Sequence, residues 1–209
     1  MPIIASGTQT FAATDTGLAG SVGESVADGV TTFTAGSGIS GIALSDADGG
    51  SYALQNFAAV SADLSGASGG TLAINGASSA DVTLGDGNYG VTVANTVGAA
   101  AASFTAGAGS DQIRFDGSGP ADFTFGTGTA TVWGGSGADS FNFHDGDGLG
   151  TIANFSASQG DGLDIDAALK GSLTTSVSGG NTLLSFGDSQ HGVLLQGVSN
   201  FDTNTIHWT

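Results

Sequence analysis

Apolar residues along this chain stand singly among glycine, serine, threonine and aspartate, and they alternate with polar residues over short runs. The alternation is clearest near the C-terminus, at 150–155, 163–166, 181–186 and 192–198. A period of two residues is typical of strands with one buried face, and the Gly/Asp/Ser clusters between the runs are typical of tight turns. Only 166–170 suggests a short helix. The pattern predicts an all-β chain of many short strands.

A nine-residue repeat lies in the middle of the chain. Residues 134–142 match G-G-x-G-x-D-x-U-x, where U is apolar, at every specified position. Residues 106–114 depart from it only at the first glycine. Two weaker units lie between them, ten residues at 115–124 and nine at 125–133, so the register runs through four units with one insertion. Upstream the period fades, and residues 31–105 are expected to form degenerate coils of similar architecture.

Each half of the repeat has its own physical task. The glycines permit a tight bend that turns backbone carbonyls inward, and the aspartate adds a charged oxygen. The x-U-x half is a short strand with one inward apolar side chain, here Ile113, Val132 and Phe141. One coil cannot bury that side chain alone, whereas stacked coils can. The sequence therefore predicts a right-handed parallel β-roll or β-helix, a solenoid, with a C-terminal β cap.

The charge balance changes the picture, because 2 basic residues face 19 acidic ones and the net charge is −17. Nucleic acid is excluded as a partner, since backbone phosphates require a basic surface. Glu24 is the only glutamate, which leaves 18 aspartates. A surface acidified for solubility would use both residue types, whereas aspartate suits turns and oxygen-rich cation sites. The bias points to calcium.

Residues 106–166 resemble the RTX, or hemolysin-type calcium-binding, repeat proteins. In that family two nonapeptides form one coil, turns on the same side are two repeats apart, and each calcium ion lies between such neighbours. The resemblance implies Ca²⁺ ligands at these positions: Gly107, Gly109, Asp111, Gly117, Gly119, Asp122, Gly126, Gly128, Gly135, Gly137, Asp139, Asp145, Asp147, Asp161 and Asp164.

The resemblance also implies which turns stack on one another. Three pairs are expected: the turn with Gly117, Gly119 and Asp122 on the turn with Gly135, Gly137 and Asp139, the turn ending at Asp111 on 126–128, and 126–128 on 144–148. Ala130 stands where an aspartate belongs, so one site on that side is expected to be weak or absent.

Residues 204–209 are similar to the uncleaved export region of type I secretion substrates. Residues 1–7 lack the basic and continuous apolar parts of a cleaved signal, and no run approaches the length of a transmembrane segment. The chain has no cysteine, so neither disulfides nor thiolate sites hold it together. We therefore expect a secreted or cell-surface protein. Its regions would be 1–30, an N-terminal cap or lead-in; 31–105, degenerate coils; 106–148, the calcium-binding β-roll; and 149–209, the C-terminal cap and export region.

The expected function is structural or adhesive, as a component of a surface layer, biofilm matrix or cell surface that folds or rigidifies on binding Ca²⁺. Its expected partners are calcium ions, cell-surface polysaccharide and further copies of the chain that meet at unpaired solenoid edges. An enzyme is not expected, because the usual nucleophiles and acid/base pairs reduce to Ser, Thr, Asp and three dispersed His.

Two alternatives stay open. One is a calcium-dependent polysaccharide-binding module with surface aromatic residues, for which the candidates are Tyr52, Tyr89, Trp133 and Trp208. The remote alternative is an ice-binding protein, suggested by the alternating threonines Thr127, Thr129 and Thr131. Calcium-dependent retention on a glycan array would favour the first alternative over the structural role.

Overall fold

The computed structural model describes residues 3–6, 9–15, 22–46, 48–188 and 190–209, with side chains described from residue 22 onward. Most of this part of the chain is strand, as the alternation predicted. The helices within it are two short 3-10 turns, η1 (Ala167–Ser172) and η2 (Thr203–Thr205). The first confirms the short helix expected near 166–170.

The strands form two long sheets that enclose the core. The ten-stranded sheet contains, in spatial order, β1 (Ile3–Ser6), β2 (Gln9–Asp15), β5 (Ile39–Ser45), β7 (Ala59–Leu64), β9 (Ser79–Leu84), β11 (Ala101–Thr105), β13 (Ala121–Thr124), β15 (Ser140–Phe143), β17 (Gly162–Ile165) and β21 (His207–Trp208). The eleven-stranded sheet contains β18 (Leu173–Ser178), β19 (Asn181–Phe186), β20 (Gly192–Leu195), β16 (Leu149–Ile152), β14 (Thr129–Trp133), β12 (Ser110–Phe115), β10 (Asn88–Ala94), β8 (Gly69–Asn75), β6 (Gly50–Gln55), β4 (Val30–Ala35) and β3 (Val22–Ala27).

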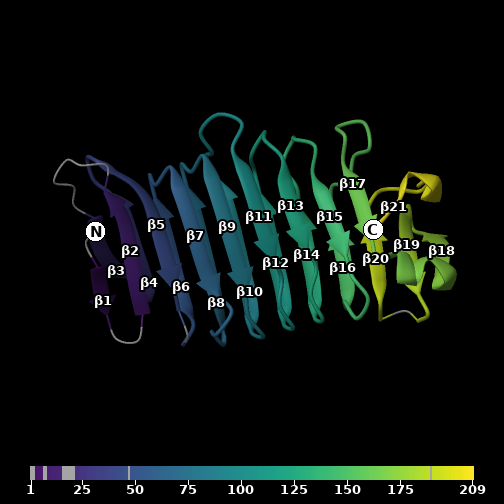
Figure 1. Ribbon diagram of the computed structural model, residues 1–209, viewed down its shortest axis with the longest axis horizontal. Coiled ribbons are helices and arrows are strands. Elements are labelled where there is room, and N and C mark those ends of the chain that lie inside the picture. Colours follow the sequence, from purple (N-terminus) through teal and green to yellow (C-terminus); the bar gives the residue numbers. More distant parts are fainter. Residues whose placement is uncertain (1–2, 7–8, 16–21, 47, 189) are drawn as a thin grey trace.

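From β4 to β17 consecutive strands alternate between the two sheets, so each coil contributes one strand to each sheet. Strands of successive coils pair in parallel, as β11 does with β13 and β12 with β14. The coils follow one another along the long axis of the molecule (Figure 1). The predicted all-β, parallel β-solenoid of the β-roll type is confirmed.

Antiparallel strands close both ends. At the N-terminal end β2 pairs with β1 and β5, and β3 pairs with β4. Of the expected cap at 1–30, positions 1, 2, 7, 8 and 16–21 lie outside the described residues. At the C-terminal end β19 pairs with β18 and β20. The cap was expected from residue 149, but β16 and β17 still continue the parallel sheets, so the antiparallel part begins at β18.

The core consists of inward side chains stacked from coil to coil. Phe104, Phe123 and Phe141 form the central stack, with ring centroids 5.1 and 5.2 Å apart and nearly parallel planes. Phe155 and Phe201 continue it toward the C-terminal cap. This aromatic stack joins the coils of β11, β13 and β15 through apolar contacts that require no ion.

The register corrects one feature of the predicted repeat. Asp122 pairs with Ser140, so Ala121 rather than Asp122 is level with Asp139. Asp122 lies exposed on the outer face of β13. The inserted residue is Phe115, which ends β12 inside the core at 0% exposure. Phe115 belongs to the preceding strand, so the following unit is the nine residues 116–124. Ala121 then occupies the aspartate position of that unit, and Asp122 lies one residue later, on the strand.

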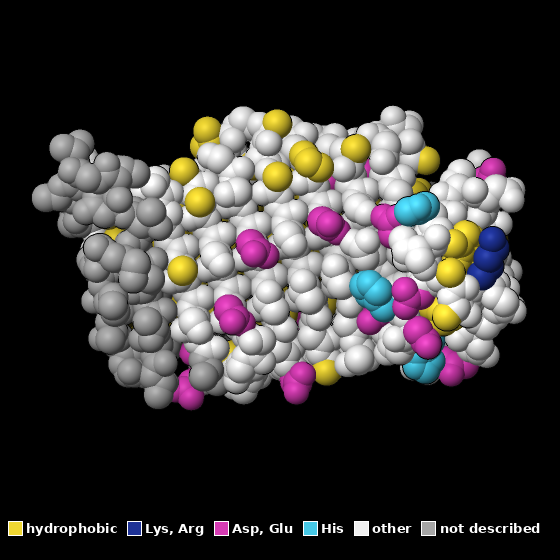
Figure 2. Space-filling view, in the orientation of Figure 1, with side chains coloured by type: hydrophobic (Ala, Val, Ile, Leu, Met, Phe, Trp, Pro, Cys, Tyr) yellow, Lys and Arg dark blue, Asp and Glu magenta, His cyan; other side chains and the backbone are white. Residues whose placement is uncertain are grey.

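The face of the solenoid drawn in Figure 2 carries few charged side chains. In the face shown in Figure 2, uncharged polar and backbone atoms predominate, acidic side chains lie singly along the solenoid, and Lys/Arg colour appears only at the C-terminal end. No helix of the described ranges has the length and apolar character that crossing a membrane requires.

Candidate functional site

The glycine-rich turns stack directly on one another, as predicted. Gly135 and Gly137 lie so close to the carbonyl oxygens of Gly117 and Gly119 that neither could carry a Cβ without a shift of the backbone. The amide of Ser136 donates a hydrogen bond of 2.9 Å to the Gly117 carbonyl. This confirms the stacking of the two turns, although their aspartates are not level.

The opposite side of the solenoid shows the same arrangement. The turn at 126–128 lies against Gly107 and Gly109, and the Gly128 amide donates to the Gly107 carbonyl at 3.2 Å. The Gly148 amide in turn donates to the carbonyl of Gly126 at 2.9 Å. Both predicted pairs on this side are therefore confirmed as stacked turns.

The aspartate position of the repeat forms one column on each side. On the side of the eleven-stranded sheet, Asp111 is level with Ala130, as predicted. On the other side, Asp139 is level with Ala121 in one neighbouring coil and with Asp161 in the next. Asp139 and Asp161 therefore occupy the same position in consecutive coils.

Asp139 is buried, and only one of its two carboxylate oxygens accepts a hydrogen bond in the described part of the chain. Its Oδ1 accepts a hydrogen bond of 2.8 Å from the Ala121 amide, and its side chain is only 2% exposed. Its Oδ2 is buried and has no hydrogen-bond partner among the described residues. Burial raises the pKa of Asp139 to about 6, and the charge of Asp161 adds to this shift, whereas the backbone amides of Ala121 and Gly135 oppose it. The folded chain therefore holds a proton on this carboxyl more readily than on an exposed aspartate.

Asp161 binds the backbone of its own turn and of the adjacent one. Its Oδ1 accepts from the Asp139 amide at 3.0 Å and its Oδ2 from the Ser156 amide at 2.8 Å. Burial is the main cause that raises the pKa of this carboxyl as well. The two acidic groups are therefore adjacent, desolvated and linked through the main chain of Asp139.

Two other predicted calcium ligands, Asp111 and Asp147, accept hydrogen bonds from backbone amides of the turns. Asp111 accepts hydrogen bonds from the amides of Tyr89 at 3.0 Å and Gly107 at 3.2 Å. Asp147 accepts from the His144 amide at 2.7 Å within its own turn. Burial raises the pKa of both carboxyls. Asp111 has Ala130 as its level neighbour, and the charge of Asp166 adds to the raised pKa of Asp147. Both carboxylates accept hydrogen bonds from backbone N–H groups of the turns.

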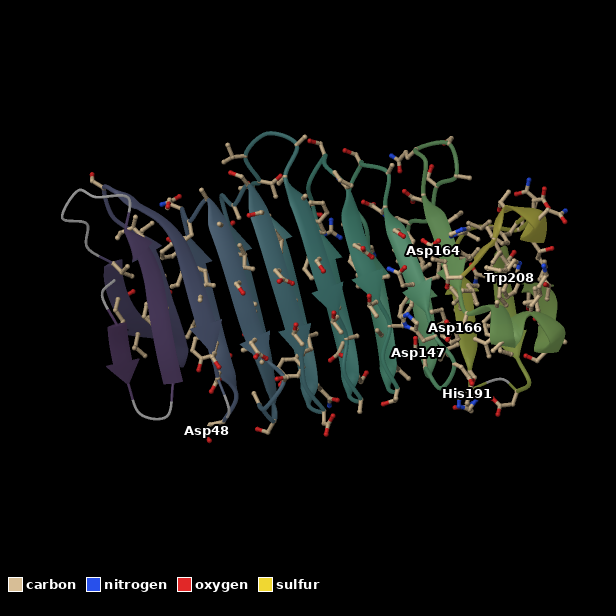
Figure 3. All side chains as sticks on the ribbon, viewed as in Figure 1. Asp48, Asp147, Asp164, Asp166, His191 and Trp208 are labelled. Atoms are coloured by element: carbon tan, nitrogen blue, oxygen red, sulfur yellow. The ribbon has the colours of Figure 1, made fainter. Side chains whose placement is uncertain are left out.

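The remaining acidic candidates lie elsewhere at the C-terminal end, where Figure 3 shows Asp147, Asp164 and Asp166 on neighbouring elements. Asp145 is exposed, and its amide donates to Asp166 at 2.7 Å. Asp164 lies on β17 and accepts from the Ser140 hydroxyl at 2.6 Å. It belongs to the outward row of the strand, which separates it from the inward Asp139.

Within the described residues, no group of three or more His, Cys, Asp or Glu side chains is placed to hold a metal ion. A calcium site in these turns would therefore combine few carboxylates with backbone carbonyls, a donor set that Ca²⁺ accepts. Asp139 and Asp161 fit such a site, because one carboxylate oxygen is buried without a partner and a second carboxylate is adjacent. Between Asp139 and Ala121, and between Asp111 and Ala130, the neighbouring coil offers no second carboxylate.

The raised pKa of Asp139 predicts how stability depends on pH without calcium. Folding raises this pKa from 3.8 to about 6, so the folded state holds the proton more tightly than the unfolded state. The stabilisation is fully present below about pH 4 and is lost as the pH rises through 6. We expect a loss of about 1–2 kcal/mol in metal-free buffer between about pH 4.5 and 7, measured by guanidinium unfolding.

Asp139→Asn is the matched variant for this measurement, because it cannot titrate at this position. The raised pKa values of Asp111, Asp147 and Asp161 change stability in the same direction, and repulsion among the acidic groups also grows with pH. These effects act on both proteins, so the difference between their slopes reports Asp139 together with its charge interaction with Asp161. Asp63 and Asp188 have lowered pKa values and influence stability only below about pH 4. Equal slopes for the two proteins would contradict the account.

Two aromatic candidates for a sugar-binding surface are internal. Tyr52 and Tyr89 are 3% and 4% exposed. The Tyr52 hydroxyl donates to Asp46 at 2.8 Å, and the Tyr89 hydroxyl lies 2.7 Å from the Ala67 carbonyl. Both are core residues whose hydroxyl groups donate hydrogen bonds to turn residues. The prediction that they lie on a sugar-binding surface is therefore wrong. The half-buried Trp133 and Trp208 keep access to the surface.

The threonines of β14 form no long array. Thr129 has Ser110 and Leu149 as its neighbours in the adjacent strands, and Thr131 is level with Thr151 on one side only. A row that sequence inspection missed lies on the ten-stranded sheet, at Thr83, Thr105 and Thr124. It ends at Asn142 in the next strand. Short rows of this kind give little support to ice binding.

Comparison of the chain with protein-family models, with curated proteins and with solved structures finds no match. Its function is therefore inferred from its own residues.

Proposed function

We propose that this chain is a secreted, calcium-binding structural protein of the RTX repeat kind, with an adhesive role at a cell surface or in an extracellular matrix. The observation that carries the proposal is the pairing of buried Asp139 with half-buried Asp161 in the next coil, with the Oδ2 of Asp139 left without a partner among the described residues. A bound Ca²⁺ would neutralise both carboxylates.

Calcium would rigidify the C-terminal coils rather than fold the whole chain. The apolar ladder through Phe104, Phe123 and Phe141 supplies an ion-independent core. A site with a Kd near 10⁻⁴ M contributes only about 1.4 kcal/mol at about 1 mM free ion. Extracellular calcium would then tighten the fold, whereas the low calcium inside a cell would leave this buried charge pair uncompensated.

A structural role also suits the polar groups that most resemble a catalytic set. Ser140 and His207 both contact Asp164, at 2.6 Å each. In a nucleophilic triad the imidazole lies between the hydroxyl and the carboxylate, so that it can take the proton of the hydroxyl. Here the carboxylate lies in the middle, and His207 is not placed to activate Ser140. The three side chains instead link β15, β17 and β21.

The test is a pair of thermal melts, in chelator and in about 5 mM CaCl₂, near pH 7.5. We expect calcium to raise the melting temperature of the wild type by about 3–6 °C. Asp139→Asn should melt at the same or a higher temperature than the wild type in chelator, because it removes a buried charge. In calcium it should melt lower than the wild type, because the ligand is gone.

Asp81→Asn is the matched control, since it removes the same charge from an exposed position on β9. Its calcium response should equal that of the wild type. A wild-type melt that is indifferent to calcium, or an Asp139→Asn variant with the full calcium response, would sink the proposal.

A further inference from the structure

A groove crosses the outer face of the eleven-stranded sheet, over β8, β10, β12 and β14. Its volume is about 360 Å³, within the range of roughly 300–1,000 Å³ typical of small-ligand sites. The residues that shape it are Thr71, Gly90, Thr92, Gln112, Arg114 and Trp133. Gly90 is level with Thr71 and Gln112 in the adjacent strands, and Arg114 is level with Thr92 and Trp133.

Gly90 forms the floor of this groove, and the protein itself does not require glycine there. A Cβ at this position would meet only the Thr71 side chain, at the ordinary contact distance of 3.7 Å, and the backbone is outside the left-handed region. Glycine within a strand weakens it and often marks a place where another group approaches the backbone closely. The missing side chain leaves open space over the strand, into which the ring of a ligand can approach the backbone.

The walls combine one aromatic face with hydrogen-bonding groups. Trp133 is half-buried, while Gln112 and Arg114 are exposed beside it. Arg114 is held by Asp116, with Nη2 2.9 Å from Oδ1 and Nε donating to Oδ2 at 3.1 Å. An indole face can pack against the C–H face of a sugar ring, and amide and guanidinium groups can bond its hydroxyls.

We propose that this groove binds a neutral pyranose unit of an oligosaccharide or polysaccharide, packed on Trp133 above Gly90. Charge favours a neutral sugar, because Asp116 compensates Arg114 and the chain as a whole carries a net charge of −17. Trp133 ends β14 immediately before the turn that carries Asp139, whereas the other groove residues lie on β8, β10 and β12. Sugar binding in this groove goes beyond the calcium function.

The test is retention of the full-length protein on an array of immobilised neutral and uronate-containing oligosaccharides, in calcium and in chelator. The best retained neutral glycan is then titrated against purified variants. We expect Trp133→Ala to weaken binding by about 10- to 30-fold. Trp208→Ala, at the C-terminal end of the solenoid, should bind as the wild type does.

Gly90→Val is the sharper variant, because it fills the floor without disturbing the core. A β-branched residue suits an outward strand position, so its melting temperature should equal or exceed that of the wild type. Its glycan binding should nevertheless be lost. Retention in chelator supports the groove whether or not calcium shifts the melting temperature. Retention of acidic glycans only, no retention of any neutral glycan, or unchanged binding by Gly90→Val would overturn the proposal.

Discussion

Replacement of Phe123 by alanine should lower the free energy of unfolding by about 3–5 kcal/mol. Its ring is 1% exposed and lies between the rings of Phe104 and Phe141, at 5.1 and 5.2 Å. The substitution removes a large buried ring and leaves a cavity that two stacked coils cannot close. Guanidinium unfolding followed by circular dichroism measures the effect.

The position of Phe123 adds a second expectation. Each coil of a solenoid contacts only its neighbours, so a weak central coil uncouples the two halves. We expect the variant to unfold over a broader range or in two steps. Phe201→Ala is the control, because the same change at the partly exposed end of the ladder should cost much less. Equal losses at both positions, or a loss below about 1 kcal/mol at Phe123, would contradict the stacked core.

Gly137→Ala should have the second largest effect, a loss of about 2–3 kcal/mol. A Cβ at this position would collide with the carbonyl of Gly119 in the adjacent turn. The φ of Gly137 is not in the left-handed region, so the cost comes from the spacing of the turns rather than from local strain. Thermal unfolding compared with the wild type measures it.

The matched control is Gly162→Ala, since a Cβ at Gly162 would have no atom within 4 Å. We expect a change within about 0.5 kcal/mol, or a slight stabilisation from the stiffer unfolded chain. If both alanine variants were equally stable, the glycines of the repeat would not be set by the close approach of stacked turns.

The architecture could be predicted from the sequence because its signals are local. Alternation predicts strands, and the glycine spacing of 134–142 predicts stacked turns; both follow from neighbouring residues. The level of each aspartate depends instead on where an inserted residue is placed. Phe115 can be assigned either to the turn or to the preceding strand, and the spacing of the glycines is the same in both cases. Only the assignment to the strand places Asp122 on the outer face.

The alternation of apolar and polar residues also did not predict that the side chains of Tyr52 and Tyr89 point into the core. Tyr52 packs over Gly50, where a Cβ would collide with its ring, so a small residue two positions away makes the inward orientation possible. Tyr89 lies level with Asp111 at the turn. Gly90 was the missed signal of the groove, because a glycine within an alternating strand is unusual. Its meaning depends on Arg114 and Trp133, which only the register brings beside it.

Calorimetric titration of the metal-free protein with CaCl₂ measures binding at the proposed site of Asp139 and Asp161 without relying on a change in stability. We predict one site per chain with a Kd of about 10⁻⁴ to 10⁻³ M, abolished in Asp139→Asn and retained in Asp81→Asn. Absence of binding heat, or binding that survives Asp139→Asn, would contradict the claim.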